Sequence, residues 1–300
     1  MTKRLFINIL FVVTDSYLLY ACPLIKSIVD NSNHHVNFHF IGPDLTKKNK
    51  KIIDNYVYNL GGCTSFYLCA CESFNDFYQT DRYPSFLYAK MVPHMYLPTN
   101  LDRILGLDID TLVMGNIDEF YFMEFNSNLL YACYNKRTLR NLILSKDDNI
   151  FFQNGFNGGV ILYNLMLFNQ NITIDTYKRW LREYTNRGGQ QQQFEEWIMA
   201  NTLRNKYDLK MPFDYNYNIS AVCLYEEFCH INKITPLKKI IHFQDPNNKK
   251  PWEYYDHFIL GSHDSITEYP YYEYYKQWWN IAKDLPNEIL EYYRDGSFNK

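Results

Sequence analysis

Residues 7–14 read INILFVVT, a nearly continuous apolar run that leads into the polar triplet Thr14-Asp15-Ser16. An apolar run of this length without alternation is typical of a strand buried on both faces of a parallel sheet. The wider segment from Leu5 to Val13 is too short to span a bilayer, is interrupted by Asn8 and lacks a small-residue cleavage site. We therefore predict a buried first strand rather than a membrane anchor or a leader peptide.

Helical and strand patterns alternate after this first strand. Apolar spacing predicts helices at residues 17–29 and 45–60 and strands at residues 36–41 and 63–68. This β-α-β-α-β order predicts an α/β fold with a Rossmann-like, doubly wound and mainly parallel sheet, whose ligands bind beyond the carboxyl ends of the strands. Later predicted segments are strands at 103–107, 160–163 and 239–243 and helices at 88–96 (broken or bent at Pro93), 174–185, 194–203, 271–282 and 287–293.

The chain contains no obvious linker, low-complexity tract or repeat of fixed period. We expect one catalytic domain at residues 1–260, followed by an aromatic-rich helical appendage at residues 261–300. These last helices could pack on the catalytic domain, form a homodimer contact or lie on a membrane surface. The acidic residues Glu288, Glu291 and Asp295 favour packing over membrane docking.

Charge and composition exclude some classes of protein. The formal net charge of -3 argues against a general nucleic-acid binder. The 28 Tyr and 21 Phe suit half-buried surfaces and sugar-binding clefts, although an A/T-rich genome would also favour them. The seven Cys are scattered without a usual zinc spacing. We therefore expect reduced thiols and a cytoplasmic location, or the host cytoplasm if the protein is viral.

Asp108-Ile109-Asp110 directly follows the predicted strand RILGL at residues 103–107. Two carboxylates one residue apart can reach the same cation here, because the chain leaves regular pleating at the end of a strand. Oxygen ligands suit Mg²⁺ and Mn²⁺. Asp is also common in turns and helix caps, but the apolar lead-in favours a metal site.

Three later motifs carry groups that could take part in chemistry. His242 ends a short apolar strand and precedes Lys250, which could hold a diphosphate, although a structural histidine is the alternative. Asn157-Gly158-Gly159 could let the backbone approach a ligand closely, or could form a tight turn. Glu195 and Glu196 open a helical pattern, where the helix dipole alone could explain two acidic residues.

Taken in order, these motifs resemble those of family 8 glycosyltransferases, the group that contains glycogenin and bacterial lipopolysaccharide galactosyltransferases. The resemblance runs from about Asn8 to Trp252, most of the chain. It rests on TDSY (14–17), YAK (88–90), ILGLDIDTLV (104–113), FNGGV (156–160) and the pair IHF and KPW (241–243 and 250–252).

The resemblance implies a GT-A type fold and transfer of a hexose from a UDP-sugar to a hydroxyl acceptor with retention at the anomeric carbon. The acceptor would be a carbohydrate or a protein hydroxyl, including a Tyr of the chain itself. Mn²⁺, or Mg²⁺, would be held by Asp108, Asp110 and His242. Other implied donor contacts are Thr14, Asp15 and Tyr17 at the nucleotide base, Lys90 and Lys250 at the diphosphate, Ile109 in the metal motif, and Asn157, Gly158 and Gly159 at the sugar.

Two departures from the family pattern stand out. The family usually carries Asp-Gln where the best register places Glu195 and Glu196, the residues predicted to act at the reacting sugar. A slip of the register into residues 190–193 is the alternative. Asp245 replaces a usual glycine in a longer loop after His242, which would alter the diphosphate contacts.

Two other functions compete with a transferase. A haloacid-dehalogenase-like phosphatase would use Asp108 as nucleophile and Asp110 as acid, but it needs Thr or Val where this chain has Leu112. It also needs a late acidic pair at a strand end, which the sequence lacks. A catalytically silent binding module on the same fold would not need the complete set of metal ligands.

Overall fold

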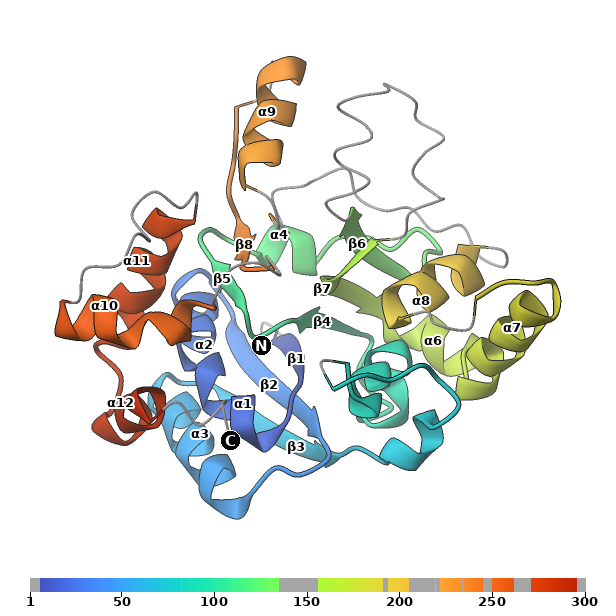
Figure 1. The fold of residues 1–300 in the computed structure, drawn as a ribbon, viewed down its shortest axis with the longest axis horizontal. Coiled ribbons are helices and arrows are strands. Elements are labelled where there is room, and N and C mark those ends of the chain that lie inside the picture. Colours follow the sequence, from blue (N-terminus) through green and yellow to red (C-terminus); the bar gives the residue numbers. More distant parts are fainter. Residues whose placement is uncertain are drawn as a thin grey trace, which may run out of the picture.

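The computed structural model describes residues 6–81, 83–134, 156–190, 194–204, 219, 222–233, 235–244, 250–261 and 271–295. Its centre is a sheet with strand order β3-β2-β1-β4-β7-β6 (Figure 1). Neighbours among β3, β2, β1 and β4 pair in parallel, whereas β7 is antiparallel to both β4 and β6. The predicted α/β fold with a mainly parallel sheet is confirmed. The strands are β1 (Phe6–Val12), β2 (His35–Gly42), β3 (Cys63–Leu68), β4 (Arg103–Leu107), β6 (Leu130–Tyr134) and β7 (Phe156–Asn164).

The first strand is buried as its apolar run predicts, and its one polar residue is satisfied. The backbone N–H of Asn8 and its side-chain amide both donate to the hydroxyl of Tyr121, at 3.0 and 3.1 Å. Asn37 donates to the side-chain oxygen of Asn8 at 3.2 Å. Because each of these polar atoms has a partner, Asn8 can occupy a central strand without a large desolvation cost.

The helix predicted at residues 17–29 is divided into α1 (Asp15–Leu18), η1 (Leu19–Ala21) and α2 (Cys22–Asp30). Pro23 lies in the first turn of α2, where its missing N–H costs no helical hydrogen bond. The predicted helix at residues 45–60 is α3 (Lys47–Asn59), which begins after Thr46, whose side chain accepts from the backbone N–H of Asn49.

The helix predicted at residues 88–96 is broken at Pro93, one of the two expected outcomes, and it consists of 3-10 turns rather than α-helix. This segment forms two 3-10 turns, η3 (Ser85–Met91) and η4 (Pro93–Met95), after η2 (Cys71–Phe74). Val92 between them has an extended φ of −137°, and Pro93 starts the second turn without an N–H to donate. The chain therefore changes direction at Val92 instead of continuing as one helix.

The chain after β4 adds a small two-stranded sheet and several helices, of which α6, α7 and α8 lie on the right of Figure 1. The short strands β5 (Thr111–Val113) and β8 (Ile240–His242) pair antiparallel, and the sequence predicts only β8. The predicted strand at residues 160–163 is longer, since it begins at Phe156 and contains both Gly158 and Gly159, so the tight-turn alternative for these glycines is wrong. The helices are α4 (Asp118–Tyr121), α6 (Leu165–Asn171), α7 (Ile174–Asn186), α8 (Glu195–Arg204) and α9 (Val222–Asn232).

The aromatic C-terminal helices pack against the N-terminal part of the sheet domain. These are α10 (Tyr255–Leu260), α11 (Tyr272–Ala282) and α12 (Asn287–Arg294), preceded by η7 (Pro251–Tyr254). They lie beside α2 on the left of Figure 1, and α11 contacts α2. Tyr20 is stacked between the rings of Trp252 and Tyr293, each 5.0 Å away between centroids. Within the described ranges, no helix combines the length and the apolar character that crossing a bilayer requires.

Candidate active site

The candidate site begins where β4 ends. Asp108 is the first residue after β4, and its N–H donates to the carbonyl of Gly159 on β7 at 2.9 Å. The carbonyl of Asp108 accepts from the N–H and the hydroxyl of Thr111, at 3.2 and 2.7 Å. This tight turn directs the Asp108 and Asp110 side chains to the carboxyl edge of the sheet before the chain enters β5.

The small sheet brings His242 to the same place. Thr111 in β5 is paired with His242 in β8, and the N–H of Phe243 donates to the carbonyl of Asp110 at 2.8 Å. His242 Nε2 lies 3.3 Å from Asp110 Oδ1 and 3.8 Å from Asp108 Oδ2. One ligand atom from each of the three residues falls within 4.8 Å of the others, as a shared divalent cation requires.

Gly159 provides the space for this arrangement. A Cβ added at Gly159 would lie 2.1 Å from Cε1 of His242, and one at Gly158 would lie 2.9 Å from Cγ of Glu196. Neither glycine has a positive φ, so the absence of a side chain, rather than backbone freedom, explains both. The glycine pair therefore serves close approach of side chains to β7.

Two lysines flank the carboxylates. Lys90 Nζ, from η3, lies 2.5 Å from Asp108 and 3.9 Å from Glu195. Lys250 Nζ lies 2.5 Å from Asp110 and donates to the carbonyl of Phe243 at 2.7 Å.

Burial alone would lower the pKa of each lysine, but the paired aspartate outweighs it, so the pKa of both Lys90 and Lys250 is raised. Burial would likewise raise the pKa of Asp110, but Lys250 and His242 outweigh it and hold that pKa well below its ordinary value. Lys90, Lys250 and Asp110 are therefore charged at neutral pH.

Glu195 and Glu196 reach the site from the first turn of α8. The backbone N–H of Gly158 donates to Glu196 Oε1 at 2.7 Å. Glu195 is only 2% exposed, and its Oε2 has no hydrogen-bond partner among the described residues. Burial and the charge of Glu196 raise the pKa of Glu195, while burial raises the pKa of Glu196 against the opposing effects of Gly158 and Lys90. The register that selects Glu195 and Glu196 thus places both carboxyl groups beside β7.

The predicted nucleotide loop lies at the carboxyl end of β1. The Asp15 carboxylate accepts from the N–H of Thr46 at 2.7 Å and from the side chain of Asn49 at 2.8 Å, so it fastens the loop to the start of α3. Thr14 is hydrogen-bonded through its hydroxyl to Ser16. Tyr17 is 37% exposed, so part of its ring remains available for stacking.

Two aromatic residues outside the sequence motifs support this loop and the segment that carries Lys250. The hydroxyl of Tyr292, in α12, donates to the carbonyl of Ser16 at 2.9 Å. Trp279, in α11, donates from its indole to the carbonyl of Pro251 at 2.8 Å, next to Lys250. The aromatic spacing of residues 271–293 predicted helices but carried no sign of which segment they would contact.

Asn157 is held in place by two neighbours. Its side-chain oxygen accepts from the N–H of Gly159 at 2.9 Å, and its amide donates to Gln244, a residue that sequence reasoning missed. Ile109 is partly buried against the core between the two aspartates. Asp245, and residues 191–193 of the alternative register, lie outside the described residues.

The sequence model of glycosyl transferase family 8 matches residues 8–256, which include every residue of this constellation except the helices behind it. The chain belongs to glycosyl transferase family 8. It is 28% identical over 182 residues (60% of the chain) to a Haemophilus influenzae protein that is named as a glycosyltransferase without a stated substrate. The chain spans 54% of that protein. It is 22% identical over 255 residues (84% of the chain) to an Escherichia coli lipopolysaccharide 1,2-glucosyltransferase, and spans 68% of that protein.

The fold of this family 8 chain also matches solved structures. The galactosyltransferase LgtC, in complex with donor and acceptor sugar analogues, superposes with a TM-score of 0.71 at 19% identity. The match covers 95% of this chain and all of LgtC (100%). The family 8 chain therefore has the GT-A glycosyltransferase fold.

Proposed function

We propose that this family 8 chain is a retaining glycosyltransferase that moves a hexose from a UDP-sugar to a hydroxyl group. The observation that carries the proposal is the convergence of Asp108, Asp110 and His242 within 4.8 Å, flanked by two lysines. Carboxylate oxygens suit Mn²⁺ and Mg²⁺ alike, and we name Mn²⁺ first because an imidazole is not among the usual ligands of Mg²⁺. When bound there, the cation would neutralise negative charge that develops on the diphosphate leaving group.

The two lysines are the groups that we assign to the diphosphate. An ammonium has three donors, and Lys250 directs two of them at Asp110 and the carbonyl of Phe243. The donor that remains, and those of Lys90 that Asp108 does not use, can bind phosphate oxygens as charge-assisted hydrogen bonds. Because both cations are already held by the partly buried carboxylates of Asp108 and Asp110, they need little reorganisation when the donor binds.

We assign the donor sugar to the space between β7 and α8. Glu195 Oε2 is a buried acceptor without a partner among the described residues, and a sugar hydroxyl would satisfy it. Glu196 is fixed by the N–H of Gly158, and Asn157 by Gly159 and Gln244. The assignment of retention rests on family membership, and we assign no protein nucleophile.

We assign the nucleotide base to Tyr17, with Thr14 and Asp15 shaping its loop. The partly exposed ring of Tyr17 packs edge-on against Trp252, 6.3 Å between centroids, so its orientation is supported from the Lys250 side. Residues 1–260 would form the catalytic unit, and residues 261–300 the helical region that supports this loop. The acceptor would be a carbohydrate or protein hydroxyl, including a Tyr of this chain.

Incubation of the purified protein with a panel of UDP-hexoses, with and without Mn²⁺ or Mg²⁺, tests the proposal. Release of UDP reports donor turnover, and intact mass spectrometry reports hexose added to the chain itself. We expect metal-dependent release of UDP from at least one donor, with no such release by the Asp110→Asn variant.

Each competing function predicts a different result in the same experiment. A silent binding module would bind a UDP-sugar in the presence of metal but would release no UDP. A phosphatase would hydrolyse p-nitrophenyl phosphate with Mg²⁺ and ignore the sugar nucleotides. Absence of both donor binding and donor turnover would overturn the transferase proposal.

A further inference from the structure

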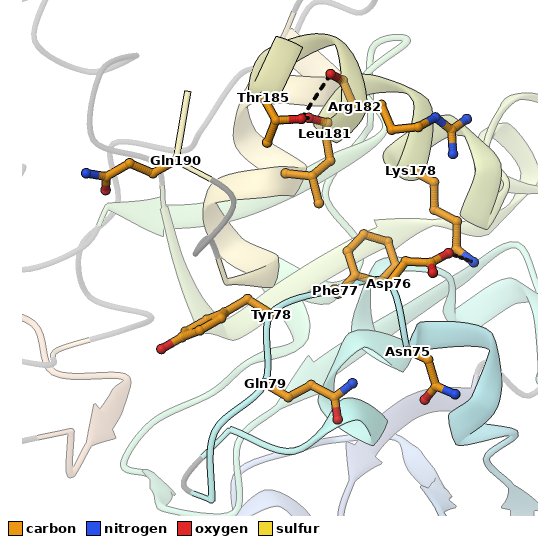
Figure 2. Close-up of a pocket in the computed structure, with 10 residues that line it drawn as sticks. All are labelled: Asn75, Asp76, Phe77, Tyr78, Gln79, Lys178, Leu181, Arg182, Thr185 and Gln190. Atoms are coloured by element: carbon orange, nitrogen blue, oxygen red, sulfur yellow. Dashed lines mark hydrogen bonds and ion pairs between the residues drawn. The ribbon is translucent and has the colours of Figure 1, made fainter. Parts of the chain in front are cut away.

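A pocket lies between α7 and the loop of residues 75–79, and none of its lining residues belongs to the candidate active site (Figure 2). Its cavity volume is about 980 Å³. This is near the upper end of the roughly 300–1,000 Å³ that is usual for small-molecule sites. Both walls contribute polar side chains, whereas the floor is formed by the buried Phe77 and Leu181. The pocket is therefore shaped for a ligand with hydroxyl or charged groups.

One end of the pocket carries an excess of positive charge. Lys178 lies 2.7 Å from Asp76, and Figure 2 shows Arg182 at the same end, one helical turn along α7. The pKa of Asp76 is lowered by its hydrogen bond to Lys178, by the positive charge of Lys178 and by that of Arg182. This carboxylate is therefore ionised. Asp76 balances one cation, and Arg182 forms no ion pair with any residue that the structure describes. Its exposed guanidinium is free to bind a carboxylate or a phosphate through paired N–H groups.

The other end offers groups that suit a sugar ring. Tyr78 presents a half-buried ring with a polar tip, and Gln190 and Gln79 supply amides that both donate and accept hydrogen bonds. Figure 2 places Tyr78 and Gln190 at the end opposite Arg182. A partly apolar ring face together with flexible amide groups matches the mixed surface of a carbohydrate.

Tyr78 also connects the pocket to the reacting centre. Its ring lies 5.6 Å from that of Phe194, the residue before Glu195. Its carbonyl accepts from the hydroxyl of Tyr88, in the same 3-10 turn as Lys90, at 2.5 Å. The pocket is therefore adjacent, through the 40% exposed ring of Phe194, to the segment that carries Glu195.

We propose that this pocket binds a sugar unit of the acceptor that carries an anionic group, with Arg182 recognising the anion and Tyr78 the ring. The proposal rests on the proposed transferase function, since it names the class of acceptor. It predicts that the enzyme prefers an acidic or phosphorylated glycan over its neutral counterpart.

Three matched monosaccharides test the pocket without any donor. They are glucose, glucuronate and glucose 6-phosphate, titrated by ligand-observed NMR into the full chain and into the Arg182→Ala and Arg179→Ala variants. Arg179 is an exposed arginine on the same helix that does not line the pocket, so it controls for a change of net charge. We expect Arg182→Ala to weaken binding of an anionic sugar by about tenfold, and Arg179→Ala to leave it unchanged.

The two anionic probes separate a carboxylate-bearing acceptor from a phosphorylated one, and either preference over glucose supports the proposal. Equal binding of glucose and both anionic sugars to the wild type, or full binding by Arg182→Ala, would overturn it. Hydrolysis of UDP-sugar, measured in parallel, should be the same in all three proteins. If Arg182-dependent binding is found without turnover of any UDP-sugar, the pocket stands and the transferase proposal fails. If a UDP-sugar is turned over but Arg182 does not affect binding, the transferase proposal stands and the pocket proposal fails.

Discussion

Gly159→Ala tests the geometry of the candidate metal site most directly. The added Cβ would lie 2.1 Å from Cε1 and 2.6 Å from Nδ1 of His242. An ordinary carbon–carbon contact is about 3.5 Å, and 3.5 minus 2.1 leaves a shortfall of about 1.4 Å. The ring has little room to move, because it is 1% exposed and its strand is paired with Thr111 on one side and Ile219 on the other.

We therefore expect the His242 ring to shift by about 1 Å, a displacement that can cost about 100-fold in catalysis. Overpacking should also lower the free energy of unfolding by about 1–3 kcal/mol. Binding of Mn²⁺ is measured from the loss of the free-ion signal in electron paramagnetic resonance, and UDP release gives the rate. Both should fall in Gly159→Ala while circular dichroism stays native.

Gly115→Ala is the matched control, because its Cβ would come closest to the flexible side chain of Lys239, at 3.0 Å, and would meet backbone only at an ordinary 3.9 Å. This variant should keep the wild-type affinity for Mn²⁺ and the wild-type rate. The reasoning would be refuted if Gly159→Ala also bound Mn²⁺ and released UDP like the wild type, since His242 would then not be a ligand held in this position.

Three further predictions follow from the contacts described above. Asp110→Asn should reduce metal-dependent transfer by about 100-fold or more while leaving the fold intact by circular dichroism, because the candidate cation loses a charged ligand; full activity would contradict the central assignment. Tyr292→Phe removes the hydrogen bond to Ser16 and should raise the KM for the donor by about 2- to 10-fold with little change in kcat, whereas Tyr58→Phe, at a 78% exposed position, should change neither. Burial lowers the pKa of His39 to about 4, against about 6.5 in the unfolded chain, so the unfolded state binds more protons between these values. Stability from this group is complete above about pH 6.5 and is lost as the pH falls towards 4, by up to about 3 kcal/mol. Urea unfolding should show that His39→Gln flattens this slope, and an unchanged slope would assign it to other groups.

The fold class and the place of Asp108 and Asp110 at the end of a strand could be predicted because their signals are local. The strand at residues 103–107 and its aspartates form one continuous segment, and the strand at residues 63–68 has the predicted bounds. A strand buried on both faces must be apolar along its whole length, so its position can be read without its neighbours. At residues 88–96 the break at Pro93 could be predicted, but the type of helix could not, because the apolar spacing fits an α-helix and two 3-10 turns equally well.

Other features depended on pairings between distant parts of the chain. The strand of residues 111–113 is too short to be recognised alone, and it exists because it pairs with residues 240–242. The same pairing turns His242 from a lone histidine into a partner of Asp110 at 3.3 Å. Likewise, nothing near Tyr292 in the sequence indicates that its hydroxyl would donate a hydrogen bond to the carbonyl of Ser16.

By itself, the sequence determined a parallel α/β sheet with carboxylates at the end of its fourth strand, because burial and strand ends leave their marks on adjacent residues. Only the tertiary structure decided that Glu195 is buried beside Lys90, that Gly159 makes room for His242, and that the aromatic helices support the loop of Tyr17. Each of these results from packing between segments far apart in the chain. Such packing depends on how complete helices and strands fit against one another, and a local pattern of residues carries no information about that fit.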